Sequence, residues 1–477
     1  MYELITEYLA PVRVLATEGN VANKMTLLQE KDLQISLKEE QTCTIVGKGF
    51  LVLDFGKEYH GGVRILTHRT SAPTVKIRLR FGESLSETYA QLGEKGACND
   101  HSLRDFETML TSFSNMTFGQ TGFRFLRIDF LEEETVSIKN IYCAFTHRVF
   151  PEPKRFVSDD RRIREIYEVA KRTIELCCQT YLWDGIKRDR LVWIGDAHPE
   201  MLALTSLYGK NPVIEDALII TAKQYPFGMW MNTMPMYSAW WVIIMADYCE
   251  MIGQPDLALQ YKDYLSGIIK QCDACVEEDG TLAFPSYFVD WQTHGQIDEL
   301  AGCRALLTVM AKKFTALAGK IALDTDLANS LLLKLKKQPI TVVKAKQVIA
   351  LKYLAEGQIS EPEKQNLIAD GAQGLSTFMS YYILKTVAEV YSADYAIEVL
   401  RDYYGAMLDK GATTFFEDFD IAWMKNSSCL DRFPEAGEKD IHGDFGNHCY
   451  VGFRHSLCHG WSAGILKFLY EYCNQKG

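Results

Sequence analysis

The sequence predicts a protein of two parts, a β-rich N-terminal third and a larger helical domain. From about residue 40 to residue 150, apolar and polar residues alternate with period two, the pattern of strands in an antiparallel sheet. After residue 150 the apolar residues recur at helical spacing as far as the C-terminus. At 477 residues the chain is long enough for two domains with separate cores. We therefore expect one domain over residues 1–150 and a second over residues 151–477.

Three segments of the first domain carry the strand alternation most clearly, over residues 50–55, 75–81 and 123–128. Glycines punctuate this region and indicate turns, at Gly47, Gly49, Gly56, Gly61, Gly62, Gly82 and Gly122. Short strands separated by turns are typical of an antiparallel β-sandwich. The sequence thus predicts a jelly-roll-like module in the first domain.

A change of period marks the second domain. Pro151 and Pro153 discourage both helix and central strand, so the segment that they bound is a predicted hinge. Residues 158–160 read Ser-Asp-Asp, a good N-cap, and the apolar spacing that follows predicts a helix as far as Cys177. Further helices are predicted over residues 212–223, 237–251, 255–275, 298–319, 325–335, 341–355, 361–369, 376–391, 393–408 and 461–473. Periodicity alone allows either a closed double ring of helices or an open solenoid.

The composition excludes several kinds of partner. A net charge of −11 and a pI near 5.5 disfavour nucleic acid and anionic membranes, which would repel such a surface. No apolar stretch predicts a membrane span, and residues 1–20 lack the pattern of a secretory signal, so we expect a cytoplasmic protein. The 13 scattered cysteines fit a reducing compartment. No cofactor or metal is expected, and the partners left open are a neutral small molecule and a second copy of the chain.

The densest group of chemically active residues lies over residues 183–200, just after the helix predicted to end at Cys177. It holds three aspartates, two tryptophans and three basic residues. A glycoside hydrolase needs one carboxyl that is protonated near neutral pH and another that stays ionised. Clustered carboxylates push their pKa values apart and make that division possible. The alternative is a capped helix end whose aspartates and arginines form ion pairs on the surface.

Residues 184–196 read DGIKRDRLVWIGD, which resembles the signature of the α-L-rhamnosidases of glycoside hydrolase family 78. The common form of that signature is Asp-Cys-Pro-x-Arg-Asp-Glu-Arg-x-Gly-Trp-x-Gly-Asp. Residues 411–417 are similar to the family's Gly-Ala-Thr-Thr-x-Trp-Glu, and residues 456–463 to its Ser-x-x-His-x-Trp-Ser. Residues 50–57, 80–84 and 122–125 are similar to parts of the sandwich that precedes the catalytic domain in the family.

This resemblance implies a fold and a reaction. The fold is an (α/α)6 barrel that follows an antiparallel β-sandwich. The reaction is the exo-acting, inverting hydrolysis of terminal α-L-rhamnose from small glycosides or oligosaccharides, so the expected partner is a small carbohydrate. Many relatives carry a small sandwich at the C-terminus, and we expect this chain to be a short form without it. Two alternatives remain: the same fold and mechanism on a different sugar, and a catalytically inactive carbohydrate-binding or scaffold protein.

The resemblance also implies site residues. Glu417 corresponds to the general base and Asp189 to the general acid. Here the chain departs from the common signature, because it has one residue fewer before the tryptophan and an aspartate in place of the acidic glutamate. Alternative donors are Asp184, Asp196 and Glu200. Sugar-binding candidates are Asp184, Arg188, Trp193, Asp196, Trp230, Tyr237, Asp290, Trp291 and His459, and structural packing is the alternative for the last five.

Overall fold

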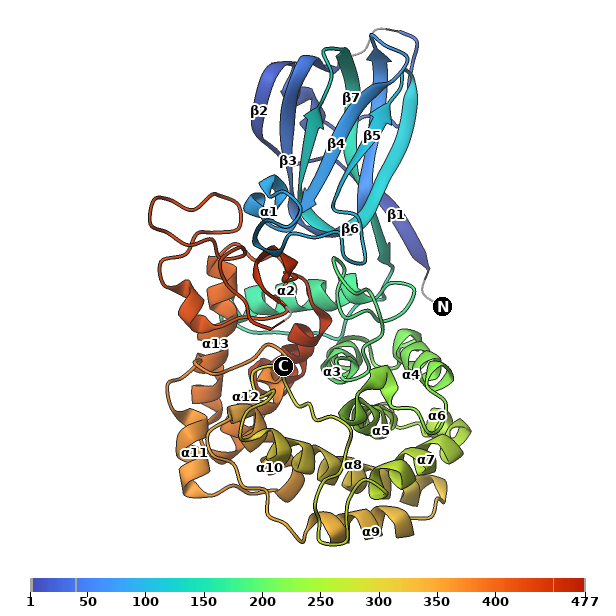
Figure 1. Ribbon diagram of the computed structural model, residues 1–477, viewed down its shortest axis with the longest axis vertical. Helices are drawn as coiled ribbons and strands as arrows, with labels where there is room; N and C mark the ends of the chain where they lie inside the picture. Colours follow the sequence, from blue (N-terminus) through green and yellow to red (C-terminus); the bar gives the residue numbers. More distant parts are fainter. Residues whose placement is uncertain (1–2, 39–40, 449, 476–477) are drawn as a thin grey trace.

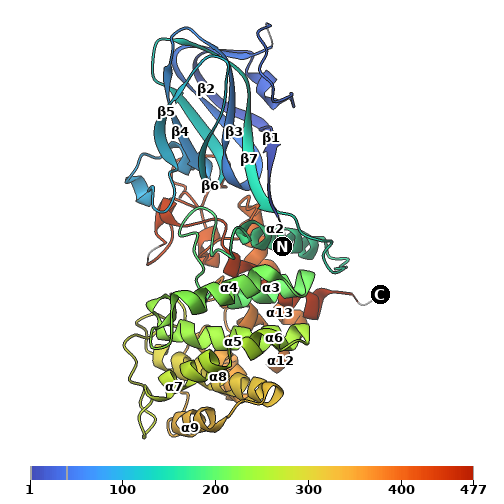
Figure 2. The ribbon, with the colours of Figure 1, turned by 90° about the vertical axis from the view of Figure 1, so that its right-hand side faces the viewer.

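The computed structural model describes residues 3–38, 41–448 and 450–475. Its strands lie between Leu4 and Arg148, and its long helices begin at Arg161. Figure 1 shows the strands gathered at one end of the molecule and the helices at the other. In the side view of Figure 2, α2 (Arg161–Cys177) lies between the strands and the other helices. The chain therefore has a mixed fold, an antiparallel β part followed by a helical part, as its two periodicities predict.

The β part is one seven-stranded antiparallel sheet, in the order β1-β7-β3-β6-β4-β5 with β2 beside β3. The strands are β1 (Leu4–Leu9), β2 (Arg13–Ala22), β3 (Cys43–Thr70), β4 (Val75–Gly82), β5 (Asp105–Leu110), β6 (Ser114–Phe130) and β7 (Thr135–Arg148). The long strand β3 pairs with β7 through both of its ends, so that Ser137 lies between Thr44 and Arg69. The sheet therefore curls around a single apolar core.

The three predicted strand segments are confirmed, since they fall within β3, β4 and β6. The prediction that glycines separate short strands is wrong, because all seven of those glycines lie inside these strands. Gly47, Gly56 and Gly61 have φ values of 76°, 83° and 151°. The pairing of β3 with β6 shifts register near the last two. These glycines form bulges that bend one continuous strand instead of ending it.

The helical part begins as predicted, because the Asp160 carboxylate accepts hydrogen bonds from the backbone N–H groups of Arg162 and Ile163. The helices that follow are α3 (Ala197–Tyr208), α4 (Pro212–Gln224), α5 (Pro235–Ile252), α6 (Asp256–Gln260), α7 (Lys262–Asp273), α8 (Glu299–Ile321), α9 (Asp326–Leu335), α10 (Lys346–Glu356), α11 (Glu361–Ile368), α12 (Ser380–Val390), α13 (Ala393–Asp409) and α14 (Ile465–Phe468). Packing contacts run from α2 through α3, α5, α8, α10, α12 and α13 and back to α2. The described helices thus close on themselves, as Figure 1 shows, and do not form an open solenoid.

Several predicted helices have different bounds. The one predicted over residues 255–275 is divided at Tyr261 into α6 and α7. Residues 341–345 are not helical, and there the Asp298 carboxylate accepts three backbone N–H groups ahead of α10. The helix predicted over residues 461–473 is present as a continuous but irregular run, with a 3-10 turn before α14 and a π turn after it. None of the described helices is long and apolar enough to cross a membrane, and none of the described cysteines forms a disulfide.

A buried ion pair lies where the sheet meets the helical part. The Asp54 carboxylate in β3 accepts hydrogen bonds from Arg124 Nε at 2.9 Å and from Arg13 Nε at 3.0 Å. Arg124 also donates to the carbonyl of Gly411, just after α13, at 3.3 Å. Burial alone would raise the pKa of Asp54, but the two guanidinium groups hold it below its ordinary value. Asp54 therefore contributes to stability as a carboxylate.

Replacing Asp54 with Asn should destabilise the protein by about 3 kcal/mol at pH 7, because two guanidinium groups lose their buried counter-charge. A carboxyl with a lowered pKa contributes fully to the free energy of unfolding at pH values above its ordinary pKa, near 3.9. That contribution is lost as the pH falls through the pKa of the folded state. Urea unfolding at several pH values measures this difference, with the exposed Asp402→Asn as the control. A difference that stays constant down to pH 3 would contradict the ionised pair.

Candidate active site

The segment between α2 and α3 forms a tight turn that carries the signature. The backbone N–H of Asp184 donates to the Leu191 carbonyl at 3.0 Å, and the Asp184 carboxylate accepts the Leu191 N–H at 3.0 Å. Asp189 and Arg190, at the tip, have φ values of 54° and 55°. Side chains with a Cβ rarely adopt this left-handed conformation, so surrounding contacts must hold the turn.

Two further loops join this turn through backbone hydrogen bonds. In the loop after α13, the Glu417 N–H donates to the Ser456 carbonyl at 3.0 Å. In the loop before α14, the His459 N–H donates to the Phe415 carbonyl at 3.0 Å. The Gly460 N–H donates to the Asp184 carbonyl at 2.7 Å. The three segments that resemble the family's motifs therefore meet in one place.

The guanidinium of Arg188 lies between the two carboxyls predicted to be catalytic. Its Nη1 donates to Asp189 Oδ1 at 3.0 Å, and its Nη2 donates to Glu417 Oε1 at 2.5 Å. The second oxygen of Glu417 accepts the Ser456 N–H at 3.0 Å, and that of Asp189 accepts Trp193 Nε1–H at 3.0 Å. One buried cation thus fixes both carboxyls, and each carboxyl has a further donor that sets its orientation.

Other acids converge on His459. Its Nε2 lies 3.6 Å from Glu417 Oε1, 3.8 Å from Asp184 Oδ2 and 3.9 Å from Asp196 Oδ2. These separations are longer than hydrogen bonds, so a hydroxyl group placed among them could bind several of the four side chains. Burial, followed by the neighbouring carboxylates, raises the pKa of Asp184 well above its ordinary value. Burial also raises the pKa of Asp196 and lowers that of the His459 imidazole, so at this end of the site burial favours the uncharged form of each group.

These groups face a cavity of about 390 Å³ in the helical part, to which the β part contributes His101. Its apolar wall comes from loops between helices and from the C-terminal loop, and consists of Trp193, Met234, Tyr237, Phe288, Trp291, Tyr450 and Trp461. A second hollow of about 210 Å³ adjoins the first at Glu417 and contains Asp290 and Asp418. Burial raises the pKa of Asp290 to about 6 and that of Asp418 to about 7. Aromatic faces beside a few acids are well suited to a neutral polar ligand such as a sugar.

Most of the predicted site residues meet in the larger cavity, namely Asp184, Arg188, Asp189, Trp193, Asp196, Tyr237, Trp291, Glu417 and His459. Asp290 lines the adjoining hollow. Trp230 lines neither space, and its ring packs beside Phe284 with a centroid separation of 5.8 Å. Glu200 is buried in α3 and does not line the cavity, so it is poorly placed to donate a proton to a ligand.

Several residues of the cavity carry no signal in the sequence. His101 comes from the loop between Gly96 and Asp105 in the β part, and its Nε2 lies 3.4 Å from Asp189 Oδ1. Arg454 and Tyr450 come from the loop before α14. Local periodicity reports the face of an element, so it cannot find residues that reach a site only when two parts of the fold dock.

Solved structures share this fold. A rhamnosidase from Klebsiella oxytoca with rhamnose bound superposes with a TM-score of 0.73 and 18% identity, over 99% of this chain and 96% of that one. A GH78 family rhamnosidase of Bacillus sp. GL1 gives a TM-score of 0.71 at 17% identity, over 94% of this chain and 48% of that one. An α-L-rhamnosidase from Dictyoglumus thermophilum gives a TM-score of 0.66 at 14% identity, over 99% of this chain and 52% of that one. No protein-family model matches the chain, and no curated protein matches it significantly.

The comparisons confirm the resemblance at the level of the fold. The chain has the mixed β and helical fold of α-L-rhamnosidases and spans almost the whole of the first and about half of the other two. At these identities the likeness concerns the fold alone, and the chemistry has to be argued from the site.

Gly195→Ala should destabilise the protein by about 1–3 kcal/mol, because a Cβ at this position would overlap the ring of Tyr237. The shift of Tyr237 would break the 2.9 Å hydrogen bond from its hydroxyl to Asp196. Urea unfolding and a crystal structure of the variant measure both effects. Gly319→Ala in α8 is the matched control, since its Cβ would meet open space and should raise stability slightly. Equal stabilities of the two variants would exclude this close packing.

Proposed function

We propose that this protein is an inverting, exo-acting α-L-rhamnosidase that releases terminal rhamnose from small glycosides or oligosaccharides. The observation that carries the proposal is the pair Asp189 and Glu417, fixed by the single guanidinium of Arg188 in a cavity of acids and aromatic rings. The fold adds support, because a solved rhamnosidase of this fold has rhamnose bound.

In the proposed reaction Asp189 is the general acid and Glu417 the general base. Glu417 takes a proton from a water molecule whose oxygen attacks the anomeric carbon, while Asp189 donates its proton to the departing glycosidic oxygen. Arg188 lies between the two carboxyls, and a group in that position favours the wide separation that leaves room for the water of an inverting enzyme. The two roles therefore fall to carboxyls on opposite sides of one cation.

Exposure supports Asp189 over the other acids as the donor. The Asp189 side chain is 17% exposed and lies beside His101, which is 38% exposed, so this side of the cavity opens to solvent. Asp184 and Asp196 are only 4% and 5% exposed. A leaving group must depart toward solvent, and the acid that protonates it must lie on that side. We therefore assign Asp184 and Asp196, with His459, to binding of the sugar hydroxyls.

The walls suit a terminal 6-deoxy sugar. Rhamnose has an apolar methyl group, which Met234, Phe288 and Trp291 could contact, and hydroxyls that the buried acids could bind. A cavity of about 390 Å³ is at the small end of the range for ligand pockets and fits one sugar with little else. The proposed binding set is Asp184, Arg188, Trp193, Asp196, Tyr237, Asp290, Trp291 and His459, and it omits Trp230.

We further propose an (α/α)6 barrel for the helical part and a jelly-roll-like sandwich for the curled sheet, with the domain boundary near residue 150. The strands end at Arg148 and α2 begins at Arg161, which supports that boundary. We propose a cytoplasmic location on the composition alone, with the small carbohydrate as the partner.

Release of nitrophenol from p-nitrophenyl α-L-rhamnoside is the direct test. Glu417→Gln should lower kcat by about 10³-fold, because the amide cannot take the proton from the attacking water. Asp189→Asn should lower kcat by about 10²-fold on this substrate and by more on a rhamnoside with a poorer leaving group. A panel of other nitrophenyl sugars tests the specificity.

Asp184→Asn is the matched control for the acid. Asp184→Asn should raise KM, because Asp184 binds the sugar in this proposal. Its effect on kcat should depend less on the leaving group than the effect of Asp189→Asn does. If the loss of kcat depends on the leaving group in Asp184→Asn and not in Asp189→Asn, the general acid is assigned wrongly. If the wild-type protein binds rhamnose without turnover of any glycoside, the proposed activity is wrong.

The stereochemistry has its own test. Proton NMR of the first turnovers should detect β-L-rhamnose before mutarotation, because a water held by Glu417 attacks the face opposite the α-linked leaving group. Initial appearance of the α-anomer would mean a covalent intermediate and would overturn the proposed inversion.

A further inference from the structure

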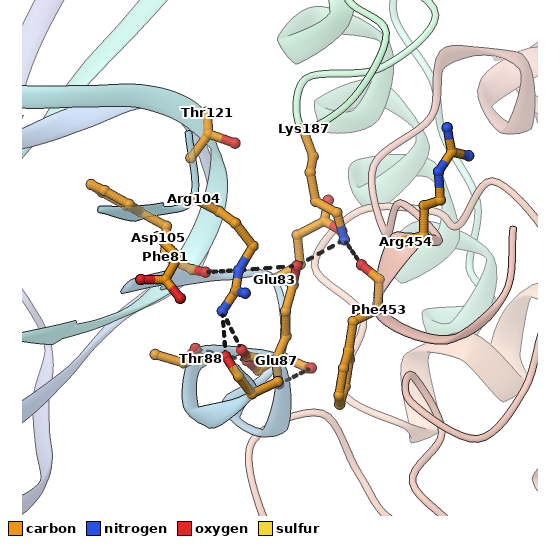
Figure 3. Close-up of polar contacts among 12 residues, drawn as sticks. Phe81, Glu83, Glu87, Thr88, Arg104, Asp105, Thr121, Lys187, Phe453 and Arg454 are labelled. Carbon is orange, nitrogen blue, oxygen red and sulfur yellow. Dashed lines mark hydrogen bonds and ion pairs between the residues drawn. The ribbon is translucent and has the colours of Figure 1, made fainter. Parts of the chain in front are cut away.

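Lys187, directly before Arg188, does not line the cavity. Figure 3 shows its side chain extending toward Glu83 and Phe453, where the β part meets the C-terminal loop. Its side chain is 9% exposed. The ammonium lies 3.0 Å from Glu83 Oε2 and 3.0 Å from Glu87 Oε1. It also donates to the carbonyls of Phe453 at 2.8 Å and His455 at 2.7 Å. The buried ammonium therefore forms two hydrogen bonds and two ion pairs.

The acceptors belong to two other parts of the chain. Glu83 follows β4, and Glu87 lies in α1 (Leu85–Tyr89), both in the β part. Glu83 also accepts the Leu457 N–H at 2.8 Å and the Ser456 hydroxyl at 3.1 Å. The carboxylates thus hold the signature turn through Lys187 and the His459 loop directly.

The same carboxylates form a cation site that Lys187 already fills. Ligand atoms of Glu83, Glu87 and His442 lie within 4.8 Å of one another, a grouping that could hold a metal ion. His442 has other partners, since its Nδ1 lies 2.8 Å from Ser84 Oγ and its Nε2 lies 2.9 Å from the His455 carbonyl. The ammonium is thus the positive charge that these acids surround.

The opposite side of the turn is held by the β part as well. The Ser102 hydroxyl donates to the Lys187 carbonyl at 2.8 Å. Arg190 donates to the carbonyls of His101 and Gln120, the latter at 3.2 Å. The left-handed residues Asp189 and Arg190 lie between these two sets of contacts. The conformation that aims Asp189 into the cavity therefore depends on both.

We propose that Lys187 is a positioning residue of the active site, whose ammonium, held by Glu83 and Glu87, fixes the turn so that Arg188 reaches both Asp189 and Glu417. This rests on the proposed function. The β part is accordingly a component of the catalytic machinery and not a separate accessory module.

Lys187→Met keeps the length of the side chain and removes its charge. We expect kcat on phenyl α-L-rhamnoside to fall about 100-fold with little change in KM, because a displaced turn misplaces the acid. On 2,4-dinitrophenyl α-L-rhamnoside, which needs little protonation, the fall should be tenfold or less. A merely structural lysine would lower both rates equally, through the fraction of folded protein.

Two further variants separate position from stability. Lys139→Met is the matched control, because Lys139 is a buried lysine of β7 paired with Asp32 at 3.0 Å within the β part, and it should leave both rates unchanged. Lys187→Met combined with Glu87→Gln removes the lysine together with one of its two acidic partners. The double variant should regain thermal stability, because fewer buried carboxylates lack a counter-charge, without regaining kcat. Wild-type rates in Lys187→Met, or full recovery of kcat in the double variant, would overturn the proposal.

Hydrogen exchange distinguishes this proposal from the proposed function. Lys187→Met should speed amide exchange over residues 184–192 and 453–459 by tenfold or more, with Lys139→Met as the reference. This result does not require turnover. A wild-type protein without rhamnosidase activity would overturn the proposed function alone, whereas unchanged exchange in Lys187→Met would overturn the positioning role alone.

Discussion

The site is organised around the guanidinium of Arg188. It is 6% exposed and donates to both Asp189 and Glu417, so one cation lies against the two acids of the proposed reaction. Burying a cation or a carboxylate alone is costly, and the three groups are stable there only as a set. Guanidinium geometry also gives direction, because its donors point along fixed axes and so restrict where Asp189 and Glu417 can lie. The contacts of the neighbouring loops serve to keep this one group in place.

The β part contributes to that placement at several points of contact. Asp54 and Arg124 reach the loop after α13, and Glu83 binds the loop that carries His459. Gly122 lies so close to the signature turn that a Cβ there would be 3.0 Å from the backbone nitrogen of Lys187. These residues fall in the segments over 50–57, 80–84 and 122–125 that resemble the family's sandwich. These segments therefore serve both the apolar core of the sheet and the interface with the helical part.

The sequence predicts elements well where one face is apolar and poorly where burial is complete. The N-cap at Asp160 and the strands of β4 and β6 follow from local rules that the structure obeys. Helix α3 was not predicted, because nearly all its residues are buried and no polar face reveals its period. The glycines of β3 look like turns locally but form bulges because β6 and β7 pair with the strand on both sides. Tertiary pairing decided that outcome, and no local signal reports it.

The site divides in the same way. Motif resemblance brought together Asp184, Asp189, Glu417 and His459 because their spacing along the chain is similar to that of a known family. The motif resemblance did not identify a role for His101 or Lys187. His101 reaches the cavity from the β part, and the Lys187 side chain lies against Glu83 and Glu87. Their roles depend on how the β part and the helical part meet.

The excess of acids in the cavity follows from a division of labour by burial. Asp184 and Asp196 lie deep, where desolvation raises the pKa of each and so favours its protonated form. A protonated carboxyl can both donate and accept a hydrogen bond, which suits a sugar hydroxyl that does the same. Burial thus opposes further negative charge beside Glu417, and the Arg188 guanidinium lies between Asp189 and Glu417, the two groups that the proposed reaction uses. Depth in the cavity, and not residue type, thus separates the proposed binding aspartates from the proposed catalytic one.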